Sequence, residues 1–170
     1  EGYDQANFTI PLYKYGSTSE YIRSIKGTTY NIQNGKIVQT SLEQKNIFSE
    51  NKSEFVKLSK FTLPDIKEGA IIDVEYTVIS PDIFNFRTWN FQSELPKLKS
   101  VYTVLIPSIY EYNVLLKGAL KLTKTDSKVE RQCLSIYNTR VDCSNITYTM
   151  DNIPAFKEEA YMLASKNYLS

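Results

Sequence analysis

Hydrophobic and polar residues alternate most regularly over positions 71–80, where the sequence reads IIDVEYTVIS. A period of two puts alternate side chains on opposite faces of a β-strand, so this segment predicts a strand with one buried face. Pro81 follows, and it ends the strand because proline has no backbone N–H to donate to a central ladder. The side chains that we expect in the core are Ile72, Val74, Tyr76 and Val78.

Shorter patterns of the same kind predict strands along the rest of the chain. Turn residues separate them about every eight to twelve positions, which is typical of an antiparallel sandwich and leaves no room for crossover helices. Pro11 is compatible with a strand only at a sheet edge or a bulge. Residues 21–30 allow either a strand or an irregular connection. The other strands are expected at residues 7–15, 45–48, 54–63, 99–106, 112–122, 129–137 and 141–150.

Asn34-Gly35 is the strongest turn signal in the chain. A two-residue type I′ turn needs a positive φ at both central positions, which asparagine and glycine adopt most readily. The flanking segments 29–33 and 36–40 therefore predict a hairpin in which Gln33 lies opposite Lys36.

Together these elements predict an all-β fold. We expect a two-sheet antiparallel β-sandwich of roughly 8–11 strands, with at most one short helical turn in the tail, residues 151–170. A chain of 170 residues fits one domain, and no linker or internal repeat interrupts it. Residues 1–170 are therefore expected to form a single β-sandwich domain.

Composition agrees with this fold class and excludes several functions. Thirteen tyrosines and eight phenylalanines against six glycines suit a pleated, half-covered surface. The net charge of +1 is spread without blocks, so no nucleic acid or anionic membrane is expected as a partner. No apolar run reaches the roughly 18 to 20 residues of a membrane span. Histidine is absent, which excludes a Ser-His-Asp or Cys-His centre within the chain. We expect no catalytic residue, no metal, no cofactor and no enzymatic activity in the isolated chain.

Cys133 and Cys143 lie on the two arms of the last predicted hairpin. A three-residue loop over residues 137–139 would put them directly opposite each other, which fits a disulfide and hence an oxidising compartment. The alternative is a pair of reduced, small apolar side chains. We favour the disulfide.

Asp73 and Glu75 share one face of the 71–80 strand, at a spacing that glycosidase carboxylate pairs also show. Charged residues on the solvent face of a strand are common, however, because they keep it soluble. We therefore interpret this pair as a solvated face.

Aromatic residues gather between positions 83 and 112, and they support two interpretations. A single tryptophan in a sandwich is most often buried between the sheets, and we favour this core role for the cluster. The alternative is an exposed platform on which a sugar stacks, and its candidate ligand-binding residues are Phe86, Trp89 and Tyr110. The cluster comprises Phe84, Phe86, Trp89, Phe91, Tyr102, Tyr110 and Tyr112.

A series of short motifs over residues 20–170 resembles a bacterial domain of unknown function that precedes transglutaminase-like domains. The resemblance depends on the order of the motifs, since each alone is short. In chain order they are Leu63-Pro64 with Gly69, Ser80-Pro81, Trp89-Asn90-Phe91-Gln92, Leu95-Pro96, and Ile153-Pro154-Ala155 with Glu158.

The resemblance implies a transglutaminase-associated N-terminal β-sandwich domain in secreted or periplasmic proteins of Gram-negative bacteria. It implies no catalytic residues, and it implies a C-terminal transglutaminase-like domain in the same polypeptide. We therefore expect these residues to be part of a longer protein of the cell envelope.

Two functions follow from these observations. The first is a non-catalytic module that supports, or presents substrate to, a neighbouring transglutaminase- or protease-like domain. The second is a module that binds envelope glycan or peptide through an aromatic surface near Trp89. The exposure of Trp89 distinguishes them, because only the second needs an exposed indole.

Overall fold

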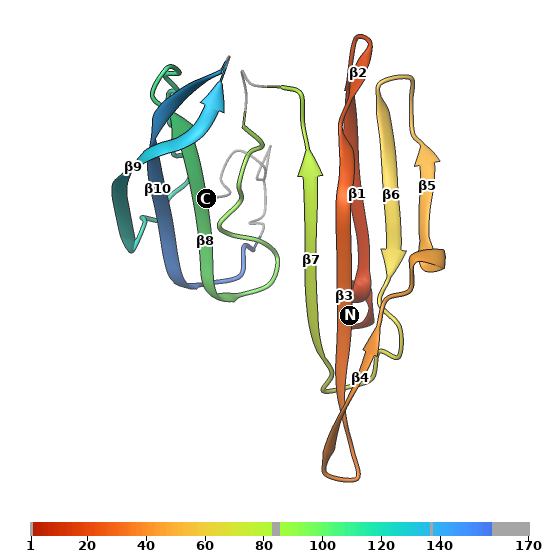
Figure 1. The fold of residues 1–170 in the computed structure, drawn as a ribbon. Coiled ribbons are helices and arrows are strands. Elements are labelled where there is room, and N and C mark those ends of the chain that lie inside the picture. The colour runs from red at the N-terminus through yellow and green to blue at the C-terminus, as the bar shows by residue number, and fades with distance from the viewer. Residues whose placement is uncertain (1, 83–85, 137, 158–170) are drawn as a thin grey trace. The chain divides into compact units, whose positions relative to one another are not determined.

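The computed structural model describes residues 2–82, 86–136 and 138–157, and in these residues the fold is all-β with antiparallel sheets (Figure 1). They form ten strands in three sheets and two short 3-10 turns. The predicted fold class is confirmed. Both 3-10 turns lie before residue 50, whereas the tail in which we expected a helical turn lies mostly outside the described residues.

The chain divides into two compact units, Glu1–Phe86 and Arg87–Ser170, which we describe one at a time. The single domain expected over residues 1–170 stays a prediction. In the first unit, one sheet has the strand order β2-β1-β6-β5 and the other has the order β4-β3-β7. Its elements are η1 (Gly2–Ala6), β1 (Asn7–Tyr15), β2 (Thr18–Ser19), β3 (Tyr21–Gln33), β4 (Lys36–Ser41), η2 (Gln44–Asn46), β5 (Ile47–Asn51), β6 (Val56–Thr62) and β7 (Ile71–Ile79).

The core of the first unit lies between its two sheets. Its buried residues come from η1, β1, β6 and the residue after β6, and partly buried residues of β3 and β7 pack against them. The two sheets therefore form a sandwich, as predicted. The buried set is Ala6, Ile10, Leu12, Phe61 and Leu63, and the β3 and β7 residues packed against it are Ile22, Ile25, Ile72, Val74 and Val78.

Gly27 of β3 packs closely against the side chains of Leu63 and Leu42. A Cβ atom at this position would lie 2.4 Å from Cδ2 of Leu63 and 3.3 Å from Cβ of Leu42. Both distances are shorter than ordinary van der Waals contact, so only a residue without a side chain fits beneath Leu63.

The Asn34-Gly35 hairpin forms as predicted. Asn34 and Gly35 have φ values of 51° and 73°, and Gln33 pairs with Lys36 in the ladder between β3 and β4. Pro11 pairs with Leu58 of β6, whereas β2 pairs with Lys14 and Tyr15 near the end of β1.

The strand predicted over residues 71–80 is β7, and three of its four expected core residues pack against the core: Ile72, Val74 and Val78. The prediction for Tyr76 is wrong, since this side chain is 47% exposed. β7 is the outer strand of its sheet, and the β3–β7 register shifts between Ile22 and Ser24, close to the Ile25–Tyr76 pair. A large ring at this irregular outer position is not enclosed on both sides.

The described residues of the second unit form one sheet, with the strand order β8-β10-β9. Its strands are β8 (Lys97–Pro107), β9 (Lys124–Ile136) and β10 (Thr139–Ile153). Phe91, Met150 and Ile153 are buried, and Tyr102, Leu120, Leu122 and Tyr148 pack against them. The core therefore lies between one face of the sheet and irregular segments that cross it.

The strand predicted over residues 112–122 is wrong, since this segment is irregular. Gly118 has a φ of 98°, which interrupts an extended backbone. The apolar residues that suggested a strand differ in burial. Leu120 packs against the core, whereas Leu115 and Leu116 are 75% and 59% exposed.

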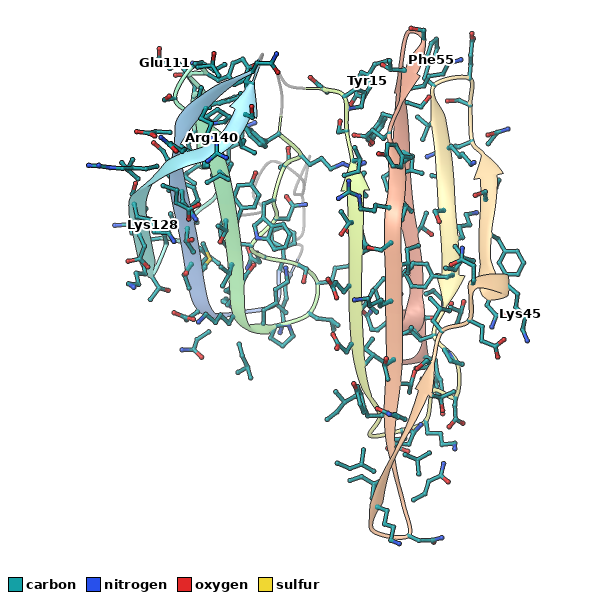
Figure 2. All side chains as sticks on the ribbon, viewed as in Figure 1. Tyr15, Lys45, Phe55, Glu111, Lys128 and Arg140 are labelled. Atoms are coloured by element: carbon teal, nitrogen blue, oxygen red, sulfur yellow. A yellow bond between two sulfur atoms is a disulfide. The ribbon has the colours of Figure 1, made fainter. Side chains whose placement is uncertain are left out.

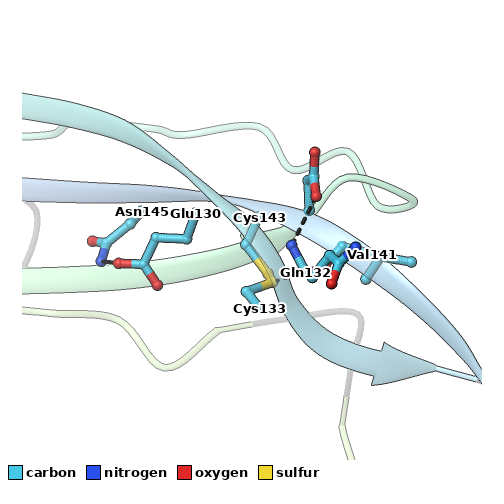
Figure 3. Close-up of a disulfide and its surroundings, with 7 residues drawn as sticks. Glu130, Gln132, Cys133, Val141, Cys143 and Asn145 are labelled. Carbon is cyan, nitrogen blue, oxygen red and sulfur yellow. Dashed lines mark hydrogen bonds between the residues drawn. A yellow bond between two sulfur atoms is a disulfide. The ribbon is translucent and has the colours of Figure 1, made fainter.

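Cys133 and Cys143 form a disulfide, with their Cα atoms 5.9 Å apart (Figure 3). The predicted bond is confirmed, but the predicted register is wrong. Ile136 pairs with Thr139, so the turn has two residues, of which residue 137 lies outside the described part of the chain.

A β-bulge, and not a longer turn, brings the two cysteines together. The register of the β9–β10 ladder shifts between Val141 and Cys143, so that Cys143 pairs with Glu130. Gln132 has a φ of 51°, and its N–H donates to Asp142 Oδ1 over 2.8 Å (Figure 3). The extra residues of β9 thereby turn Cys133 toward Cys143, whose side chain is only 1% exposed.

The close approach at Gly27 generates the first prediction. Gly27→Ala should lower the free energy of unfolding by about 1–3 kcal/mol, because the added methyl group forces Leu63 or a whole strand to move. Denaturant unfolding measures this change. The control is Gly2→Ala, where an added Cβ meets no atom within 4 Å and should change stability by less than about 0.5 kcal/mol. Equal effects of the two substitutions would contradict the close-packing argument.

The disulfide generates the second prediction. Replacing both cysteines by alanine should destabilise the second unit by about 2–3 kcal/mol, because the bond closes a short loop and restricts the unfolded chain. Trp89 is the single tryptophan and lies in this unit, so its fluorescence reports the transition. Wild-type protein in reducing agent should unfold at the midpoint of the double variant. A variant that unfolds at the wild-type midpoint in oxidising buffer would refute the contribution of the bond.

Candidate aromatic binding surface

Three aromatic side chains of the second unit stack in a row, which we call the aromatic row: Trp89, Tyr102 and Tyr148. The ring centroids of Trp89 and Tyr102 are 5.9 Å apart at an interplanar angle of 22°, and those of Tyr102 and Tyr148 are 6.5 Å apart at 17°. Near-parallel rings at these separations are favourable offset stacks.

The β-ladder sets the position of two rings of the row. Tyr102 of β8 and Tyr148 of β10 are direct partners in the antiparallel register. Directly opposed side chains in such a ladder lie close enough for rings to contact each other, so the pairing alone brings them together. β8 is an outer strand of this sheet, and Trp89 precedes it in the chain and adds the third ring beside Tyr102.

Two hydrogen bonds fix the segment that carries Trp89. The indole Nε1–H donates to Ser100 Oγ over 3.1 Å, and Ser100 is only 5% exposed. Lys97 Nζ donates to the Asn90 backbone carbonyl over 3.1 Å. Ser100 and Tyr102 are two positions apart on β8 and share a face, so the strand holds both the ring and the hydroxyl that orient the indole.

Trp89 is partly open to solvent although it is anchored. Its side chain is 47% exposed, whereas Phe91, two residues further on, is 6% exposed and belongs to the core. The aromatic cluster is thus divided: Phe91 has the core role that we favoured, and Trp89 has the exposure that the platform interpretation requires.

Burial also affects the titrating groups beside the row. Burial raises the pKa of the Tyr102 hydroxyl, and the neighbouring Tyr148 hydroxyl raises that pKa further. Burial lowers the pKa of the Lys97 ammonium. The raised pKa keeps the Tyr102 hydroxyl neutral in the physiological range, and the surface has apolar ring faces with hydroxyl groups at their edges.

Of the other two candidate ligand-binding residues, Phe86 is exposed and Tyr110 is partly buried. Phe86 is 48% exposed and is the last residue of the first unit. Tyr110 stacks edge-on against Tyr112, with ring centroids 6.2 Å apart. Phe84 lies outside the described residues.

Tyr148 was not predicted as part of the site. It lies 59 residues after Trp89, and no local pattern connects the two. The signal that could have found it is the pairing of β8 with β10, which follows only from the register of the complete sheet.

The carboxylate pair considered for catalysis lies on an open strand face. Glu75 Oε2 is 3.6 Å from Lys26 Nζ, with the two side chains 70% and 75% exposed, and Asp73 is exposed as well. Nothing in this arrangement excludes water from the carboxylates. Among the residues that the structure describes, no three His, Cys, Asp or Glu side chains gather where they could share a metal ion.

The fold and this surface define an all-β antiparallel module that presents an anchored, partly exposed aromatic row. Residues 7–157 match the family model of DUF3857, described as a domain of unknown function with a solved structure. The match covers most of the chain, which therefore belongs to this family. No curated protein and no solved structure matches the chain. In the described residues, no helix has the length and apolar character needed to cross a membrane.

The hydrogen bond between Trp89 and Ser100 generates the third prediction. Ser100→Ala removes the acceptor of the indole N–H, so Trp89 should become more mobile and acrylamide should quench its fluorescence more strongly. The free energy of unfolding should fall by about 1 kcal/mol. The control is Thr103→Ala, which removes a 3.0 Å hydrogen bond to Thr147 and should leave quenching unchanged. Unchanged quenching in Ser100→Ala would show that this bond does not hold the indole.

Proposed function

We propose that this chain is a non-catalytic binding module. In this proposal the aromatic row binds the flat face of an envelope glycan or a peptide and presents it to a neighbouring transglutaminase- or protease-like domain of the same polypeptide. The observation that carries the proposal is the 47% exposure of Trp89 in a ring system held by stacking and by Ser100.

Stacked, anchored rings suit the recognition of flat apolar faces. A sugar ring has an apolar C–H face that packs against an aromatic ring, and aliphatic or aromatic side chains of a peptide pack in the same way. A fixed indole loses little conformational freedom when a ligand binds, which improves affinity without any further contact.

The chemistry of the chain supports a binding role without turnover. The 170 residues contain no histidine to act as a base, and both cysteines are joined in the disulfide. Acyl transfer of the transglutaminase kind needs an activated nucleophile, which in this proposal belongs to the neighbouring domain.

The disulfide supports a location in the periplasm or outside the cell. Disulfides persist in oxidising compartments and are rare in the reducing cytosol of mesophiles. The remaining parts of the proposal, a Gram-negative cell envelope and a C-terminal transglutaminase-like partner, rest on the order of motifs described above.

Titration with soluble envelope fragments tests this function and is the fourth prediction. Disaccharide-peptide fragments of peptidoglycan should quench or shift Trp89 fluorescence, and isothermal titration calorimetry should detect binding. Trp89→Ala should weaken that binding at least about tenfold, which corresponds to roughly 1.4 kcal/mol. The control is Leu98→Ala, a substitution of an 86% exposed apolar residue on β8. Wild-type and Trp89→Ala proteins with equal affinities would rule out the row as the binding surface.

A further inference from the structure

A shallow depression lies on the outer face of the β2-β1-β6-β5 sheet, in the first unit. Its volume is about 370 Å³, and we call it the Phe48 depression. Its polar lining and its exposed ring come from β1, η2, β5 and β6. These residues are Asn7, Thr9, Asn46, Phe48, Lys60 and Thr62.

Strand register builds this depression from two adjacent rows of side chains. Lys60 of β6 pairs with Thr9 of β1 on one side and with Phe48 of β5 on the other, which makes the first row. Thr62 pairs with Asn7 in the second row. The intervening Phe61 is buried in the core, so its two neighbours on β6 must point outward.

Phe48 forms an exposed apolar wall of the depression, which Phe8 and Phe61 also line. The Phe48 side chain is 64% exposed although it is one of the largest apolar groups on the sheet. Thr62 Oγ1–H donates to Asn7 Oδ1 over 2.7 Å, which orients the Asn7 amide and leaves its Nδ2 group to donate elsewhere. Asn46 contributes a second amide from the end of η2.

The depression carries no uncompensated charge. Lys60 is the one ionisable residue among the described residues that line it, and the Lys60 ammonium forms an ion pair with Glu50, the residue two positions after Phe48. An anionic ligand would have to compete with this carboxylate. A neutral ligand keeps the ion pair intact.

From this geometry we infer a second binding site, for a single neutral sugar ring. One aromatic face beside amide and hydroxyl groups matches a pyranose, which has an apolar C–H face and a rim of hydroxyl groups that donate and accept hydrogen bonds. The volume of about 370 Å³ falls in the lower part of the range of small-molecule sites. This inference goes beyond the proposed function, because the site lies in the first unit and uses no residue of the aromatic row.

NMR titration of the ¹⁵N-labelled full chain tests the site and is the fifth prediction. The probes are the methyl glycosides of glucose, galactose, mannose and N-acetylglucosamine, with glucuronate and inorganic phosphate as anionic comparisons. At least one neutral glycoside should shift the amide resonances of Phe48, Lys60 and Thr62, with a Kd on the order of 1 mM. Phe48→Ala should raise that Kd at least about tenfold, and Thr62→Val should raise it several-fold because it removes a hydroxyl at similar size.

The matched control is Phe55→Ala. Phe55 is 62% exposed, and it lies at the opposite end of the same sheet from Lys45, the neighbour of Asn46 (Figure 2). Its substitution should leave the Kd unchanged, as should Trp89→Ala. Phe48→Ala, Thr62→Val and Phe55→Ala should keep the wild-type unfolding midpoint, since these three side chains are largely exposed.

Three outcomes would overturn the inference. The first is the absence of shifts with every neutral glycoside at about 50 mM, well above the expected Kd. The second is tighter binding of glucuronate or phosphate than of any neutral probe. The third is a set of shifts confined to Trp89 and its neighbours, which would support the proposed function and reject this site. Loss of binding in Trp89→Ala alone would have the same meaning.

Discussion

The structure of the first unit depends on the contact of Leu63 with Gly27. Leu63 follows β6 in one sheet and packs directly over the backbone of β3 in the other, at a distance that excludes any side chain. The Leu63 N–H also donates to the Ala6 carbonyl over 3.0 Å, and Asn31 of β3 donates to the Asp65 carbonyl over 2.9 Å. The Leu63–Gly27 contact and these two hydrogen bonds therefore fix the segment in which the chain passes from β6 of one sheet to β7 of the other.

Thr29, two residues after Gly27 on β3, lowers the stability of the sandwich. Thr29 is fully buried, and its hydroxyl has no hydrogen-bond partner among the described residues. A buried hydroxyl without a partner costs about 1–3 kcal/mol, so the sandwich retains this residue against a penalty. Burial of the apolar side chains around Thr29 must therefore contribute more free energy than the unpaired hydroxyl costs.

Local signals in the sequence predicted the local structure. Asn34-Gly35 identified both the hairpin and its register, and the alternation over residues 71–80 identified β7 and three of its core residues. The disulfide was predicted from cysteine spacing, but its register was not, because the bulge at Gln132 depends on the fit between two complete strands. The aromatic row was missed in part for the same reason, since Tyr148 joins Tyr102 only through the β8–β10 pairing. Residues 112–122 show the opposite failure: they alternate like a strand, yet the positive φ of Gly118 prevents a regular one.

The outer strands of the three sheets differ in how they resist the addition of a foreign strand. β9 carries Lys124, Asp126, Lys128 and Glu130 and then a bulge, and β7 carries Asp73 and Glu75. β8 has two lysines, and β2 and β5 are short. β4 has one charged residue, at its first position, and its Ile37 faces Ile32 with both side chains more than three-quarters exposed. Charge, irregularity and shortness are what protect sheet edges from intermolecular pairing. Among the described strands, the β3–β4 hairpin is therefore the sheet edge with the least protection against pairing with another chain.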